Sequence, residues 1–382
     1  MMQDKELNSL IQEPRLLETV LELVQLDSES RNERAVADYV KQKLKTLGYM
    51  VKEDDADTYT GGNAGNVIAY HAGSGTGKSV LFCAHMDTVA PGNGVKPVVE
   101  GSIVKSDGTT VLGGDDKAGI AAILEALAVL HDTNAVHGPV QVVFTVAEEV
   151  GLLGAKYLNL DTLQPVDAAF FFDSDGMPNQ ICVASPYHID ITARFYGKAS
   201  HAGVEPEKGI SAVQMAANAI ASMQLGRLDA ETTANIGMIQ GGTATNVVAG
   251  ETVIHGEARS LVKDKVDAQI QHMKDCCTEA AAQFDGRVEV EIEECYAAIS
   301  LDEYSTTVQL AKKAVQRLGM KPELVKSGGG SDANVFCGKG IPATNIGCGM
   351  NNVHSVQEYL NLEEVKAAAA FVLAVTEAAL ED

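Results

Sequence analysis

The sequence predicts an α/β protein whose mixed or parallel sheet is flanked by helices and interrupted by a smaller inserted domain. The segments 141–146 and 168–172 are largely apolar, as expected for strands that are buried on both faces. Such strands alternate with segments of helical spacing, for example residues 17–24, and this alternation is typical of a sheet with helices on both sides. After about residue 186 the order changes to β-α-β-β-α-β, which is the split pattern of a ferredoxin-like domain.

The first part of the chain contains most elements of the larger sheet. Periodicity and β-rich runs predict helices over 4–26, 32–47 and 116–131 and strands over 49–53, 65–71, 78–84, 141–146 and 168–172. Ser28 and Ser30 are candidate caps for the second of these helices. The glycine-rich stretch 91–114 predicts a loop with a hairpin.

The inserted domain and the return to the larger sheet follow from the same periodicities. Strands are predicted over 187–196, 233–240, 247–259 and 287–294, with helices over 209–224 and 263–283. Beyond them the sequence predicts helices over 303–318 and 362–380 and strands over 323–326 and 341–346. We therefore divide the chain into a larger domain made of residues 1–185 and 298–382 and an inserted domain over 186–297, with a hinge near 185 and 298.

Composition limits the partners that this protein can have. Its 382 residues are enough for two domains, and 46% apolar residues can bury a large core. With 29 basic and 52 acidic residues the net charge is -23, which opposes nucleic-acid binding and favours solubility. The seven cysteines form no CxxC pair, the polar N-terminus lacks a secretory apolar core, and no apolar run reaches the roughly 18 residues of a membrane span. We expect a cytoplasmic protein with reduced thiols and no membrane contact.

Metal-binding residue types follow the predicted strands. His85 comes directly after one apolar strand, the pair Glu148 and Glu149 follows a second, and Asp173 follows a third. The carboxyl ends of strands are where an α/β sheet presents its chemistry. Each residue alone is more simply a hydrogen-bonded partner or a loop acid, but together they predict a metal centre. Asp175, two residues further on, is the alternative to Asp173.

Two further positions complete the set of candidate ligands. Asp115 and Asp116 begin a helix, where acids are common as caps, but Gly113 and Gly114 before them allow the backbone to approach a ligand closely. A carboxylate at this place can bridge two cations. His354 follows a glycine-rich loop, and by itself it would be a structural histidine. With the strand-end residues these positions predict a two-metal hydrolase centre, in which one adjacent glutamate binds metal and the other accepts a proton from water.

Seven motifs carry a resemblance to a known family. In chain order they are His85-Met86-Asp87-Thr88-Val89, Gly114-Asp115-Asp116-Lys117-Ala118-Gly119, Ala147-Glu148-Glu149-Val150-Gly151, Phe172-Asp173, Ser200-His201-Ala202-Gly203, Gly330-Ser331-Asp332 and Asn352-Val353-His354. The sequence resembles the metallopeptidase family that contains peptidase T, succinyl-diaminopimelate desuccinylase and aminoacylase, most nearly its peptidase T-like branch. The resemblance spans nearly the whole chain and implies a zinc-exopeptidase-like fold with a ferredoxin-like lid domain.

The resemblance implies a role for each matching residue of the centre. Two divalent metal ions, zinc by expectation and manganese or cobalt as alternatives, would be held by His85, Asp115, Glu149, Asp173 and His354. Of these residues, Asp115 would bridge the two ions. Asp87 would orient His85, and Glu148 would be the general base that acts on a hydroxide shared by the metals. The family also places a cis peptide bond after the bridging aspartate.

The resemblance also implies substrate contacts outside the metal ligands. His201, on the inserted domain, would donate to the developing oxyanion. Asn246 would bind a substrate carbonyl or carboxylate, and Arg259 would clamp a carboxylate with its planar fork, although a surface salt bridge is the simpler role for this arginine. The backbone N–H groups of Gly328–Ser331 would bind a substrate carboxylate, and Ser331 and Asp332 are candidate substrate-binding residues. Peptidase T has an arginine where this chain has Gly328, so recognition of the substrate C-terminus is expected to differ.

The predicted function is metal-dependent hydrolysis of amide bonds in short peptides, by an aminopeptidase or tripeptidase. An N-acyl amino acid deacylase, a carboxypeptidase and a dipeptidase are alternatives, because metal ligands set the reaction and not the side pockets. A peptide-binding protein without catalysis is a more remote alternative, since every expected ligand is present. The chain is expected to be a monomer or a homodimer paired through its lid domain.

Overall fold

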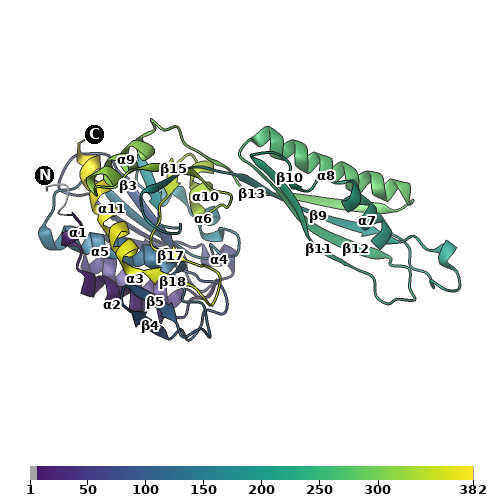
Figure 1. Cartoon of the computed structure of the whole chain (residues 1–382), viewed down its shortest axis with the longest axis horizontal. Coiled ribbons are helices and arrows are strands. Elements are labelled where there is room, and N and C mark those ends of the chain that lie inside the picture. Colours follow the sequence, from purple (N-terminus) through teal and green to yellow (C-terminus); the bar gives the residue numbers. More distant parts are fainter. Residues whose placement is uncertain (1–6, 382) are drawn as a thin grey trace. The chain divides into compact units, whose positions relative to one another are not determined.

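The structure is a computed structural model that describes residues 7–381 and divides into two compact units (Figure 1). The first unit comprises residues 7–184, 301–327 and 331–381. The second comprises residues 185–300 together with 328–330. The sequence-based boundaries at 186 and 297 lie close to these limits, but they leave Gly328–Gly330 outside the inserted domain.

A six-stranded mixed sheet forms the centre of the first unit. Its strands, in spatial order, are β1 (Met50–Glu53), β2 (Val67–His71), β6 (Val140–Thr145), β3 (Val80–His85), β7 (Ala168–Phe171) and β16 (Ala343–Asn345). From β6 to β16 neighbouring strands are parallel, whereas β1 and β2 are antiparallel to their neighbours. Every residue of β3, β6 and β7 is buried, which explains why these strands are apolar without alternation. The predicted α/β class is confirmed.

Helices cover this sheet. They are α1 (Leu7–Leu10), α2 (Glu13–Val24), α3 (Arg34–Thr46), α4 (Asp57–Thr60), α5 (Gly114–Thr133), α6 (Leu153–Tyr157), η1 (Leu160–Thr162), α9 (Thr306–Arg317), α10 (Asp332–Gly338) and α11 (Leu362–Leu380). Helix α5 packs on β3 and along α11 (Figure 1). Both helices are apolar on nearly every side because both are buried. No helix within residues 7–381 has the length and apolar character needed to cross a membrane.

Two smaller groups of strands complete the first unit. An antiparallel sheet contains β17 (Met350–Asn351), β18 (Tyr359–Asn361), β5 (Ile103–Ser106) and β4 (Pro97–Glu100), in that order. The β4–β5 pair is the hairpin that the glycine-rich stretch predicts. Strand β15 (Glu323–Lys326) pairs in parallel with β8 (Gln180–Ser185), a strand that the sequence did not predict.

The second unit has the split βαββαβ order. Its strands β9 (Tyr187–Tyr196), β11 (Thr232–Gly241), β12 (Glu251–Ser260) and β13 (Arg287–Tyr296) are antiparallel, in the spatial order β11-β12-β9-β13, with the short β10 (Gly226–Arg227) beside β11. Helices α7 (Ala212–Ser222) and α8 (Lys263–Gln283) pack on the sheet, and the unit also contains η2 (Pro206–Lys208) and β14 (Ile299–Ser300). On β9, Ile189 and Phe195 join the core with the helices, so the residues between them face the opposite side.

The first predicted helix differs from the observed one. The sequence predicts one helix over 4–26, but α1 ends at Leu10 and α2 begins at Glu13. Pro14 lies in the first turn of α2, where its missing N–H has no partner to lose, so it starts a new helix instead of continuing the previous one. Residues 4–6 of the prediction lie outside the described residues.

Candidate metal centre

The candidate ligands lie where parallel strands end. His85 is the last residue of β3, Glu148 and Glu149 follow β6, and Asp173 follows β7. Because β3 lies between β6 and β7 and runs parallel to both, the three carboxyl ends meet at one edge of the sheet. The spatial order of the strands in the sheet therefore brings imidazole and carboxylate groups to one place.

Asp115 reaches this edge from the start of α5. Gly113 has a φ of 70°, a left-handed conformation that turns the chain into the helix. The peptide bond between Asp115 and Asp116 is cis, as the family resemblance implies. The buried carboxylate of Glu358 accepts hydrogen bonds from the N–H of Gly113 at 2.8 Å and from the N–H of Asp115 at 2.9 Å. Glu358 thus holds the loop that presents Asp115.

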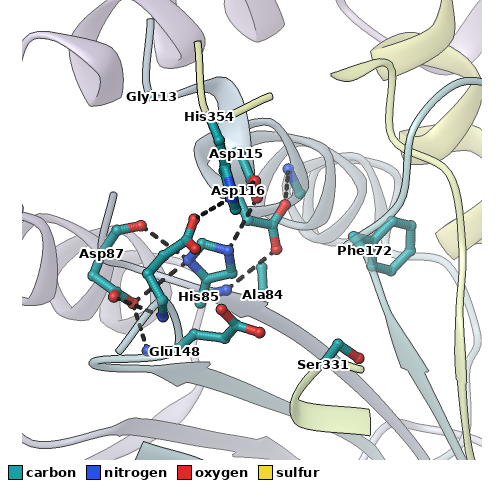
Figure 2. A network of polar contacts seen from close by, with 12 residues as sticks. Ala84, His85, Asp87, Gly113, Asp115, Asp116, Glu148, Phe172, Ser331 and His354 are labelled. Carbon is teal, nitrogen blue, oxygen red and sulfur yellow. Dashed lines mark hydrogen bonds and ion pairs between the residues drawn. The ribbon is translucent and has the colours of Figure 1, made fainter. Parts of the chain in front are cut away.

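The two oxygens of Asp115 face two different histidines (Figure 2). Oδ1 lies 3.0 Å from Nε2 of His85, and Oδ2 lies 3.2 Å from Nε2 of His354. The same nitrogen of His354 lies 3.0 Å from Oε1 of Glu149. A carboxylate that offers one oxygen to each side is suited to bridging two cations.

Two groups of ligand atoms share Asp115, and a third is formed by His85, Glu148 and Glu149. His85, Asp115 and Asp173 offer atoms within 4.8 Å of one another, and so do Asp115, Glu149 and His354. Asp175 belongs to no such group among residues 7–381, and its backbone instead forms a β-bridge to Met350. The geometry therefore favours Asp173 over Asp175.

Asp87 contacts His85 and the backbone of both adjacent glutamates. Its carbonyl oxygen lies 2.9 Å from Nδ1 of His85, and its carboxylate Oδ1 lies 3.5 Å from the same nitrogen. With the proton on Nδ1, the lone pair of Nε2 points toward Asp115. The Asp87 carboxylate also accepts hydrogen bonds from the N–H groups of Glu148 at 2.9 Å and Glu149 at 3.2 Å and from the hydroxyl of Ser30 at 2.7 Å. One buried aspartate therefore positions the histidine and both glutamates.

Burial and mutual repulsion disfavour the ionised state of several carboxyl groups. Burial raises the pKa of Glu149 and of Asp173 to about 7, and it raises the pKa of Glu148 well above its usual range, with the neighbouring Asp173 adding to the effect. A hydrogen bond to Asp115 raises the pKa of His354 to about 9. Divalent cations would relieve this repulsion, and the set of histidine and carboxylate donors suits zinc, manganese or cobalt. The residues present therefore fit a pair of metal ions.

Glu33 and Glu358 support the centre but were missed by sequence reasoning. Glu33 Oε1 accepts hydrogen bonds from the N–H of Arg31 at 2.6 Å and of Ala147 at 3.1 Å, and burial raises the pKa of Glu33 to about 7. Each is a single acid without a motif around it. Their importance comes from distant backbone partners, which no local pattern reveals.

Ser331 and Asp332, for which the sequence predicts contact with substrate, are buried at the start of α10, and that contact stays a prediction. Ser331 is 2% exposed, its N–H donates to Oδ1 of Asn334 at 3.1 Å, and its side chain caps α10. Asp332 is 3% exposed and lies within the first turn of the same helix. Its charge is one of the influences that raise the pKa of Glu148. Both residues are thus part of the buried support of the site.

The remaining predicted residues, His201, Asn246 and Arg259, belong to the second unit. His201 is exposed, and the N–H of Ala202 next to it donates to the carbonyl of Asn246 at 2.9 Å, so the two predicted contacts share one loop cluster. Arg259 donates to both oxygens of Glu257, from Nε at 3.1 Å and from Nη2 at 2.9 Å. The salt bridge weighed for Arg259 in the sequence is therefore present.

The chain is similar to several known proteins. The model of the family described as Peptidase family M20/M25/M40 matches residues 81–378. An uncharacterized protein, YqjE of Bacillus subtilis strain 168, is 49% identical over 370 residues, which are 97% of this chain and 100% of that protein.

Two solved structures resemble the whole chain. The crystal structure of aminopeptidase PepT from Bacillus cereus ATCC 10987 has a TM-score of 0.91 at 42% identity, and covers 98% of this chain and 100% of its own. The crystal structure of a tripeptidase from Staphylococcus aureus subsp. aureus Mu50 has a TM-score of 0.94 at 38% identity, with the same coverage of 98% and 100%. These matches extend over both units of the chain.

Proposed function

Because the chain belongs to peptidase family M20/M25/M40 and is a metal-dependent peptidase, we propose that it releases the N-terminal residue of short peptides, with tripeptides as the preferred length. The aminopeptidase and the tripeptidase that it resembles at 42% and 38% identity support this specificity. The observation that carries the proposal is the placement of Asp115, whose two oxygens face His85 and His354.

Two zinc ions would occupy the centre. His85 and Asp173 would hold one ion, Glu149 and His354 the other, and Asp115 would contribute one oxygen to each, as the two groups of ligand atoms support. When bound, such ions polarise a carbonyl and lower the pKa of water. Manganese and cobalt accept the same donors, and metal analysis of the purified protein identifies the native ion.

Glu148 would move the proton. It follows β6 beside the ligand Glu149, and its N–H is fixed by Asp87. Burial raises its pKa well above the usual range, which makes its carboxylate a stronger base than a solvated glutamate. Glu148 would take a proton from water and deliver it to the amine that leaves, and Asp87 would keep both His85 and Glu148 in place.

The second unit would supply contacts to the peptide. His201 would donate to the oxyanion, Asn246 would bind a carbonyl or carboxylate, and Arg259 would bind the C-terminal carboxylate. The shared loop cluster of His201 and Asn246 supports a joint role. Arg259 would have to exchange Glu257 for the substrate, since Glu257 accepts from its guanidinium in this structure. A cytoplasmic location, and a monomer or a homodimer paired through this unit, remain predictions from the sequence.

One preparation measured in two ways tests the proposal. Metal content by mass spectrometry is expected to be at least two ions per chain. Activity is compared on dipeptides, tripeptides, tetrapeptides and N-acetylated amino acids. Preference for tripeptides with a free amine supports the proposal. Preference for acetylated amino acids would identify a deacylase instead, and release of the C-terminal residue would identify a carboxypeptidase.

The Glu148→Gln variant tests the base. We expect it to keep both metals and to lose about 10²–10⁴-fold in kcat, because glutamine cannot accept a proton. Glu125→Gln is the matched control. Glu125 on α5 is also buried, but it accepts hydrogen bonds from Arg15 on α2. The control should lower stability and leave kcat unchanged. Normal turnover in Glu148→Gln would show that another group is the base.

A further inference from the structure

The second unit contains a separate cluster of potential ligands on the polar face of its sheet. His188 and Asp190 alternate on β9 with Ile189 and Ile191, which are buried in the core, so the two polar residues share the opposite face. Glu257, on the adjacent β12, lies directly across from Asp190 in the strand register. The side chains of three residues therefore meet over two neighbouring strands.

His188 lies at the centre of this cluster. Its Nε2 is 2.9 Å from Oδ1 of Asp190 and 2.9 Å from Oε2 of Glu257. Cys295, beside a bulge in β13, offers its sulfur within 4.8 Å of the ligand atoms of His188 and Asp190. The ring of His188 is held edge-on against Tyr296, with centroids 5.1 Å apart at 64°. Four donors from three strands thus converge on one region.

Hydrogen bonding alone does not account for this arrangement. A ring nitrogen carries at most one hydrogen, so Nε2 cannot donate fully to two carboxylates. Although it is close to both, this buried nitrogen makes no hydrogen bond of acceptable geometry within the described part of the chain. If Nε2 is unprotonated instead, its lone pair faces two negative oxygens, which is unfavourable unless a cation lies between them.

We propose that His188, Asp190, Glu257 and Cys295 form a divalent-metal site in the second unit, sharing no ligand with the centre built on Asp115. Thiolate, imidazole and carboxylate donors together select zinc or cobalt over magnesium and calcium, which prefer oxygen ligands alone. On binding, the Cys295 thiol releases its proton to solvent and the sulfur bonds to the metal. The ion would join β9, β12 and β13 at the end where the chain enters and leaves the unit.

Arg259 is the competing cation at this site. It donates to both oxygens of Glu257, so a metal on Oε2 would have to share or replace one of these hydrogen bonds. Arg259 also donates from Nη1 to the hydroxyl of Tyr296 and to the carbonyl of Gly328. A metal on Oε2 would therefore leave Arg259 its hydrogen bond to Oε1 of Glu257, and His188, Asp190 and Cys295 would supply the other ligands.

Cobalt titration of the full-length chain, after removal of metals with a chelator, tests the proposal. Cobalt bound to a thiolate gives a strong near-ultraviolet charge-transfer absorption, whereas cobalt bound to histidine and carboxylate does not. The candidate ligands found around Asp115 within residues 7–381 are histidines and carboxylates only, so the absorption reports on the second site whatever occurs at the first. We expect the absorption to saturate at one cobalt per chain.

Two variants and a matched control identify the ligands. Cys295→Ser and His188→Gln are expected to lose the absorption and one equivalent of zinc by mass spectrometry. Cys337→Ser should keep both, since Cys337 is the other partly exposed cysteine of the seven and its sulfur contacts the carbonyl of Ala343. Unchanged far-ultraviolet circular dichroism will show that the variants are folded. Absence of the absorption in the native chain, or its persistence in Cys295→Ser, would overturn the proposal.

Discussion

At the scale of single residues, the centre depends on carboxylates that are buried and held by the backbone. Asp87 accepts hydrogen bonds from the N–H groups of Glu148 and Glu149, and Glu358 accepts from those of Gly113 and Asp115. Charged hydrogen bonds of this kind are shorter and stronger than neutral ones. These hydrogen bonds fix the positions of the metal-binding side chains before a metal binds, which lowers the entropy lost when the site forms.

The choice between Asp173 and Asp175 is a prediction at this scale. Asp173→Asn is expected to lower metal content by about one ion per chain and to abolish most activity, because Asp173 shares a ligand group with His85 and Asp115. Asp175→Asn is the matched control, since it makes the same change two residues away in an exposed position. Mass spectrometry of the metals distinguishes them. If Asp175→Asn loses the ion instead, the assignment is reversed.

At the scale of elements, α5 approaches β7 so closely that one position tolerates no side chain. A Cβ at Gly119 would lie 2.4 Å from Oδ1 of Asp116 and 2.8 Å from the carbonyl oxygen of Phe172. Real contacts of this kind do not occur, so the helix or the strand end would have to move. Because Phe172 precedes Asp173, a proposed ligand, such movement would reach the candidate metal centre directly.

Gly119→Ala should therefore reduce both stability and metal affinity. We expect a loss of about 2–3 kcal/mol in the free energy of unfolding, as is usual when a close-packed interior is overfilled. Gly328→Ala is the control, because a Cβ at Gly328 meets no atom within 4 Å. Urea unfolding followed by circular dichroism gives both values. Equal stability of Gly119→Ala and the native chain would contradict the close approach.

An ion-pair cluster that joins α3 to β1 predicts a loss of stability in acid. Burial alone would raise the pKa of Glu53, but its hydrogen bonds to Arg34 and Lys41 outweigh burial and lower the pKa to about 2 from an ordinary value of 4.5. The pKa is lower in the folded state, so the stabilisation is present above about pH 4.5 and disappears as the pH falls toward 2. The solvent exposure of Arg34 limits its size to about 1–2 kcal/mol.

Urea unfolding of the native chain and of Glu53→Gln between pH 3 and pH 7 measures this contribution. The difference between them should be largest near neutral pH and should shrink in acid. Glu100→Gln serves as the control, because it removes an exposed pair with Lys105 and should change stability by less than about 0.5 kcal/mol at any pH. A difference that does not depend on pH would mean that Glu53 acts through packing and not through its charge.

At the scale of the whole molecule, metal binding is expected to stabilise the first unit. Its centre gathers buried carboxylates whose repulsion a cation relieves, so metal binds the folded state much better than the unfolded one. An ion present at 1,000 times its dissociation constant adds about 4 kcal/mol to the free energy of unfolding. Calorimetry of the chelated chain, with and without added metal, should show a higher transition temperature for the first unit.

Asp115→Asn provides the control for that measurement. Asp115 belongs to both groups of ligand atoms, and asparagine removes its charge with little change in shape. The variant should therefore show no metal-dependent rise in the transition of the first unit. A rise as large as that of the native chain would mean that the metals bind elsewhere.

Local patterns predicted the elements whose periodicity is clear. The alternation in β9 and the helical spacing in α8 gave bounds of 187–196 and 263–283, which the structure reproduces. Strand β8 was missed because its burial pattern neither alternates nor is continuous, and its partner β15 lies more than a hundred residues away. Glu358 was missed for a related reason, since its partner Gly113 is 245 residues away in sequence.

The sequence by itself determined the α/β class, the inserted βαββαβ order and the identity of the candidate donors, because periodicity and motif order are properties of neighbouring residues. Only the tertiary structure decided that Asp115 faces two histidines, that Asp173 and not Asp175 joins His85, and that Ser331 is engaged as a helix cap. These outcomes depend on where parallel strand ends converge and on which buried groups find hydrogen-bond partners. Both are set by contacts between residues far apart in the chain.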